Sequence, residues 1–124
     1  IMGTDVKSDN VVVDKSKAFA IRIVKMYRYL REEKREYVLS TQVLRSGTSI
    51  GANVKEAIRG QSTADFIAKM NIALKEASET EYWLELLKET DYLSPEMCDS
   101  ILPDCIELIK LLTAIVKTTK KGGA

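Results

Sequence analysis

The sequence contains no histidine, only two cysteines and two prolines, and few aromatic residues. Without histidine, the chain lacks the commonest general base, the usual activator of a serine or cysteine nucleophile, and the commonest transition-metal ligand. Acid–base chemistry would therefore rest on carboxylates. No apolar run approaches the roughly 20 residues of a membrane span, and no signal-peptide pattern opens the chain. We therefore expect a cytoplasmic protein with no membrane partner.

The 124 residues are enough for one hydrophobic core, and 30% of them are charged. Scarce prolines and aromatics favour helices over a sandwich of short strands. The two cysteines, Cys98 and Cys105, lie seven residues apart in a helical pattern. Their Cα atoms should be about 10 Å apart, beyond the roughly 7 Å limit for a disulfide. We expect both to be reduced core thiols.

Four segments have helical periodicity. We expect a disordered or extended tail over residues 1–13, a bundle over 14–118 and a frayed tail over 119–124. Start signals stand at Asp14 or Ser16, at Ser40 or Thr41, at Ser62, and at Ser94 followed by Pro95. Pro103 predicts a kink or break in the last helix near residues 99–102. The pattern predicts an all-α fold, an antiparallel up-down-up-down four-helix bundle.

The stretch "LRSGTSIGANVKEA", residues 44–57, places two glycines inside a helical pattern, where each costs about 1 kcal/mol relative to alanine. A phosphate-binding loop would need a preceding strand and a terminal Lys-Ser/Thr pair, and both are missing. Small residues on a helix instead allow a second helix to approach closely. We therefore interpret this stretch as a helix-packing surface.

A polar ridge runs along the same helix, with Arg45, Ser49, Asn53 and Glu56 at spacings of four, four and three. Carboxylates Glu76 and Glu79 share one face of the next helix. A di-metal site on these carboxylates would also need histidines from facing helices, so we expect no metal and no cofactor. We predict instead a polar seam in which Arg45 forms a buried pair with Glu76 or Glu79, and Ser49 and Asn53 also donate across the interface.

Basic residues Arg22, Lys25, Arg28 and Arg31 lie opposite the apolar stripe of the first helix. Residues 1–60 carry 12 basic and 7 acidic side chains, and residues 61–124 carry 7 and 11. This asymmetry indicates either an acidic partner for the first half or two oppositely charged hairpins within one fold. The four bases form either a solvated surface or a nucleic-acid contact.

Apolar residues outside the main stripes predict contacts between subunits. The third helix carries a second stripe, and the first carries two isolated apolar residues on its polar side. The oligomer-interface candidates are Ile21, Val24, Ile72, Trp83, Leu86 and Leu87.

The segment "LRSGTSIGANVKEA" followed by "STADFIAKMNIALKEASETEYWLELL" resembles the four-helix bundle family encoded by intervening sequences of bacterial 23S rRNA genes. The resemblance spans residues 15–118. It implies a ring-like homopentamer without established catalytic activity. Similar rings serve retroelements as accessory proteins that hold nucleic acid and a reverse transcriptase, but this chain is nearly neutral where those proteins are basic.

Two hypotheses follow for a chain that we expect not to be an enzyme. The first is a homo-oligomeric bundle, with a pentamer favoured, that binds RNA through the bases of the first helix. The alternative is a scaffold that holds a protein, such as a nucleic-acid-processing protein, and never contacts nucleic acid.

Overall fold

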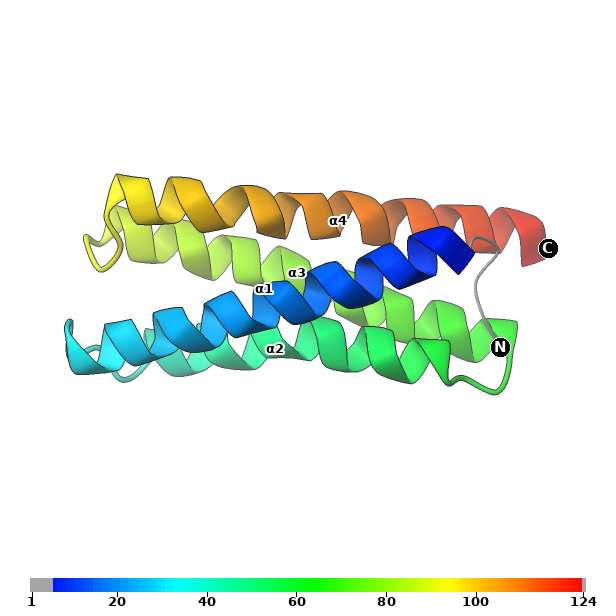
Figure 1. Ribbon diagram of the computed structural model, residues 1–124, viewed down its shortest axis with the longest axis horizontal. Coiled ribbons are helices and arrows are strands. Elements are labelled where there is room, and N and C mark those ends of the chain that lie inside the picture. The colour runs from blue at the N-terminus through cyan, green and yellow to red at the C-terminus, as the bar shows by residue number, and fades with distance from the viewer. Residues whose placement is uncertain (1–5, 124) are drawn as a thin grey trace.

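The computed structural model describes the backbone of residues 6–123 and the side chains of residues 10–122. Its four helices are α1 (Val6–Glu32), α2 (Leu39–Ile58), α3 (Thr63–Glu89) and α4 (Pro95–Gly123). Short loops join them, and each helix runs antiparallel to the next (Figure 1). Each helix packs against two neighbours, in the cyclic order α1, α2, α3, α4. The structure confirms the up-down-up-down four-helix bundle.

Helix α1 begins earlier than the sequence predicted. The expected tail covered residues 1–13, but the helix already runs from Val6, and Val12 is fully buried in the core. Val12 lies seven residues before Phe19, two turns away on the same face, so it extends the apolar stripe. The tail prediction was therefore wrong for residues 6–13, while residues 1–5 lie outside the described part.

Helix α4 also extends further than predicted, through Gly123, so residues 119–123 are helical rather than frayed. Val116 and Thr119 are buried and hold this last part against the bundle. The helix does not break at Pro103. Pro103 has no N–H to donate to the carbonyl of Asp99, one turn earlier. Both residues are solvent-exposed, so water can donate a hydrogen bond to that carbonyl instead.

Side-chain caps fix three helix starts. Ser62 Oγ accepts a hydrogen bond from the Asp65 N–H at 3.1 Å, and Ser94 Oγ accepts one from the Met97 N–H at 3.2 Å. Both caps were predicted. Helix α2 instead uses Glu36, whose carboxylate accepts bonds from three backbone N–H groups at residues 38–40, over 2.6–3.1 Å.

Burial and hydrogen bonding shift the pKa of Glu36 in opposite directions. Burial raises its pKa, but the backbone hydrogen bonds lower the pKa by more, so the net shift is downward. Glu36 is only 8% exposed and is ionised near neutral pH. A buried carboxylate thus anchors the start of α2 and the loop that leads into it.

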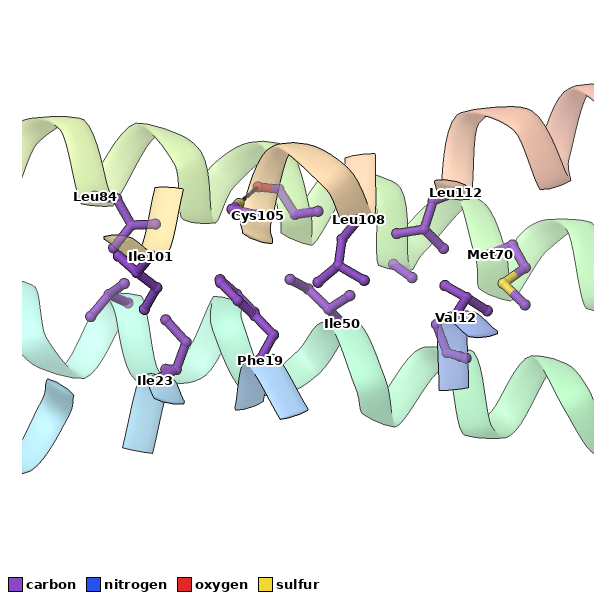
Figure 2. Packing of buried hydrophobic residues seen from close by; sticks show 14 of the residues in the cluster. Val12, Phe19, Ile23, Ile50, Met70, Leu84, Ile101, Cys105, Leu108 and Leu112 are labelled. Carbon is purple, nitrogen blue, oxygen red and sulfur yellow. Dashed lines mark hydrogen bonds between the residues drawn. The ribbon is translucent and has the colours of Figure 1, made fainter. Parts of the chain in front are cut away.

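The core lies along the bundle axis and contains side chains from all four helices. Figure 2 shows Phe19 of α1 pointing toward the axis, where it lies beside Ile50 of α2 and Leu108 of α4. Both thiols are buried and free, and Cys105 Sγ donates to the Ala77 carbonyl at 3.2 Å. Burial, with a smaller contribution from Glu81 and Glu85, raises the pKa of Cys105 to about 12.

Helix α1 packs closely against α2 at Gly47, one of the small residues of α2. A Cβ at this position would lie 2.8 Å from Cγ1 and 2.9 Å from Cγ2 of Ile23, which is fully buried. The absence of a side chain therefore lets α1 approach α2 closely. The packing interpretation of this stretch holds, and the neighbour at Gly47 is α1.

Candidate assembly and binding surfaces

The four basic residues of α1 do not form one surface. Arg22 turns toward α4, where Nη1 contacts the Asp104 carboxylate at 2.7 Å and the Ser100 carbonyl at 3.0 Å. Its Nη2 donates to Ser100 Oγ at 2.7 Å. The Arg31 guanidinium carbon lies 5.3 Å from the ring centroid of Tyr27 and 4.9 Å from that of Tyr37. Both arginines are thus engaged within the subunit.

Lys25 and Arg28 remain as the available cations of this group. Both are exposed, and neither forms an ion pair with any side chain that the structure describes. They lie three residues apart, one helical turn, and therefore point to the same side of α1. Ile21, half exposed, lies one turn before Lys25.

Arg45 joins α2 to α3 as predicted, but it is not buried. Its Nη1 lies 3.1 Å from Glu76 Oε2, and its Nη2 contacts the Glu79 carboxylate, which also accepts a hydrogen bond from Trp83 Nε1 at 2.9 Å. The Arg45 side chain is 48% exposed. Solvent screens a pair of this kind, so it contributes about 1 kcal/mol or less.

The rest of the predicted seam differs from the expectation. Ser49 donates to the Arg45 carbonyl and Asn53 to the Ser49 carbonyl, so both bond along α2 rather than across to α3. Such bonding to the preceding turn is common for short polar side chains in helices. Glu56 does reach α3, where it pairs with Lys69 at 3.1 Å.

The fully buried polar contact between α2 and α3 was missed. Thr80 Oγ1 lies 2.9 Å from Ser46 Oγ, and both residues have no exposed surface. Thr80 falls three residues after Ala77 and four before Leu84, the spacing of the core positions of α3. That spacing could have predicted from the sequence that Thr80 is buried.

The predicted interface candidates differ in how deeply they are buried. Ile21 and Ile72 are 50% and 42% exposed, while Val24 and Leu86 are half-buried and do not pack on the core. Trp83 is half-buried and packs against the core of its own subunit. Leu87 is fully buried there, so its assignment to an oligomer interface was wrong.

Tyr82 is an exposed aromatic residue that the sequence analysis did not select. It is 58% exposed, and its ring meets that of Trp83 edge to face at a centroid distance of 5.1 Å. Its spacing of ten residues from Ile72 leaves it about 80° away around the helix, so it does not belong to the stripe that selected Ile72 and Trp83.

A groove of about 580 Å³ lies between α1 and α4. Its floor is apolar and its rim is polar. The floor comprises Met26, Tyr29, Leu93, Met97 and Ile101, and the rim comprises Arg22, Lys25, Glu96 and Ser100. Figure 1 shows α1 crossing obliquely from α4 toward α2 as it approaches the end where the groove lies. The Arg22–Asp104 pair ties α1 to α4 beside it.

Among the described residues, no three Cys, Asp or Glu side chains are grouped so that they could hold a metal ion. Glu76 and Glu79 share Arg45 instead. None of the described helices is both long and apolar enough to cross a bilayer.

The fold and these surfaces define a small antiparallel four-helix bundle whose distinctive features are outward-facing apolar residues and an interhelical groove. The model of the 23S rRNA-intervening sequence protein family matches residues 8–114. The chain belongs to that family, as its two central segments indicated.

A solved structure supports the same assignment. The protein is described as one of unknown function from the S23 ribosomal protein family of Bacteroides thetaiotaomicron VPI-5482. It is 60% identical to this chain and superposes with a TM-score of 0.88, over 90% of this chain and 99% of the other. No protein of curated function matches the chain.

Proposed function

We propose that this chain is a non-enzymatic bundle that assembles with copies of itself in the cytoplasm and acts as a scaffold. The observation that carries the proposal is the set of apolar side chains held outward on rigid helices. Ile21, Ile72 and Tyr82 expose between 42% and 58% of their surface. Exposed side chains of this kind are available for contact with another chain, and aromatic residues are enriched in protein interfaces.

A non-enzymatic role agrees with the chemistry of the described side chains. The carboxylates Glu76 and Glu79 both form ion pairs with Arg45, and the thiols of Cys98 and Cys105 have raised pKa values because they are buried. Buried thiols with raised pKa values make poor nucleophiles. A ring-like pentamer is the assembly that the family resemblance implies.

Light scattering on the purified chain tests the self-assembly. We expect a mass several times the 13.9 kDa of one chain. Replacing Ile72→Asp should lower that mass, because burying an unpaired carboxylate at an interface is costly. The matched control is Val38→Asp, since Val38 is even more exposed, at 71%, but lies in a loop. A wild-type mass of 13.9 kDa would refute self-assembly.

RNA binding is a second candidate, and it rests on Lys25 and Arg28. Repetition around a ring would multiply two cations per subunit into a larger basic surface. Filter binding to RNA over a salt series tests it, with Lys25→Gln plus Arg28→Gln as the variant. Lys117→Gln plus Lys120→Gln is the control, since these exposed lysines have the same spacing on α4. Equal retention by both variants would exclude this role for α1.

A further inference from the structure

The groove between α1 and α4 has a largely apolar lining with exposed Lys25 at its side, and the outer face of α3 carries exposed Tyr82 with two exposed carboxylates. We propose that the groove of one subunit receives Tyr82 of a second copy, while Lys25 at the groove and Arg28, one helical turn further along α1, pair with Glu85 and Glu89 of that copy. This inference rests on the proposed self-assembly and names the two surfaces that would meet.

The groove suits an aromatic residue with a polar end. Buried Leu93 and Ile101 contribute to its floor, so an inserted ring would lie against apolar surface. Ser100 and Glu96 on the rim supply oxygen atoms that can accept a hydrogen bond from a phenol. Its volume of about 580 Å³ lies within the range of sites that enclose small organic groups.

Tyr82 is placed to enter such a site. More than half of its side chain is exposed, and its edge-to-face contact with Trp83 holds the ring against α3. A ring held in place loses little conformational freedom when it binds. Tyrosine is also among the residues that contribute most to interface affinity.

The charges beside the two surfaces are opposite in sign and similar in spacing. Glu85 and Glu89 follow Tyr82 by three and seven residues, which places all three on one side of α3. Both carboxylates are exposed and form no ion pair with a described side chain. Lys25 and Arg28 are likewise exposed and without an ion-pair partner. Each pair spans one helical turn, so two salt bridges can form together.

The two surfaces lie on different parts of the bundle, because α3 packs against α2 and α4 while the groove adjoins α1. A contact between different surfaces is heterologous, so each subunit retains a free groove at one side and a free Tyr82 at the other. Repetition of such a contact closes into a ring when the rotation between subunits permits.

Charge reversal tests the pairing. Lys25→Glu with Arg28→Glu makes both surfaces acidic, and Glu85→Lys with Glu89→Lys makes both basic. We expect each double variant to fall to the 13.9 kDa of a single chain in light scattering. The quadruple variant, with all four changes, restores opposite charges and should regain the wild-type mass. Lys117→Glu with Lys120→Glu, the control, should keep that mass.

The aromatic contact has its own pair of variants. Tyr82→Ala should dissociate the assembly, whereas Tyr37→Ala should not, because Tyr37 is 50% exposed but contacts Arg31 of its own subunit. Circular dichroism checks that every variant is folded. Lys25→Gln with Arg28→Gln replaces the charge-reversed pair if the latter does not fold, and it should weaken association.

The outcomes distinguish the claim of self-assembly from the claim that the groove pairs with Tyr82. A wild-type chain that is already monomeric refutes self-assembly itself. A wild-type oligomer whose mass survives both double variants or Tyr82→Ala refutes only the groove pairing. A folded quadruple variant that stays monomeric also refutes the pairing. If Lys25→Glu with Arg28→Glu abolishes RNA retention at unchanged mass, the two cations serve RNA and the pairing is wrong.

Discussion

Two glycines on the same helix should respond oppositely to the same substitution. Replacing glycine by alanine in a helix interior stabilises the helix by about 1 kcal/mol. At Gly47 the new methyl group would lie 2.8–3.1 Å from three side-chain carbons of buried Ile23. At Gly51 the nearest atoms, both of Ser16, would lie 3.4 Å away, close to ordinary contact.

The magnitude follows from these distances. Overpacking a core costs about 1–3 kcal/mol, so Gly47→Ala should change the free energy of unfolding by between zero and about −2 kcal/mol after the helix gain. Gly51→Ala should raise it by up to about 1 kcal/mol. Because the helix term is common to both variants, their difference of about 1–3 kcal/mol measures the contact with Ile23.

Guanidinium denaturation followed by circular dichroism, at one fixed protein concentration, provides the comparison. The clash also predicts that Gly47→Ala stabilises the chain when Ile23→Ala is present, because the opposing carbons are then gone. Equal effects of Gly47→Ala and Gly51→Ala, within about 0.5 kcal/mol, would refute the reasoning.

Three further predictions concern single contacts. Glu36→Gln should lower the unfolding free energy by about 1–2 kcal/mol at neutral pH, as for loss of a helix cap. Because folding lowers the pKa of Glu36, the ionised carboxylate stabilises the folded chain at pH values above the unfolded pKa. This stabilisation disappears as the pH falls through the folded pKa. The unfolding free energies of wild type and variant, measured by urea denaturation, should therefore converge in acid. Arg45→Ala should cost about 1 kcal/mol or less by urea denaturation, since Arg45 is 48% exposed; a loss of 3 kcal/mol or more would contradict this. Cys98 and Cys105 should react with an aromatic disulfide reagent only after unfolding, because burial raises the pKa of both thiols; rapid labelling of the native protein would disprove their burial.

Periodicity predicted the helices and the bundle, because each helix buries one continuous apolar face. It failed at the helix ends. The apolar residues 11–13 are too few to reveal a period alone, and only the packing of Val12 shows that α1 has already begun. Pro103 was expected to disturb α4, but its position on the solvent side allows the helix to continue.

The candidate surfaces were predicted less well, since residue type and helical position do not specify where a long side chain reaches. Arg22 lies on the flank of α1 that faces α4, so it binds Ser100 and Asp104 instead of joining Lys25. Ser49 and Asn53 are too short to prefer α3 over the carbonyl groups of their own helix. The groove depends on the oblique crossing of α1 and α4, which no local pattern encodes.

Native mass spectrometry of the wild-type chain tests the central claim most directly, because it counts the subunits in each particle. Self-assembly predicts a dominant species at an integer multiple of 13.9 kDa, and the family resemblance favours the multiple of about five. The Tyr82→Ala variant should contain one subunit per particle. Particles of 13.9 kDa alone, from folded wild-type protein at micromolar concentration, would contradict the account.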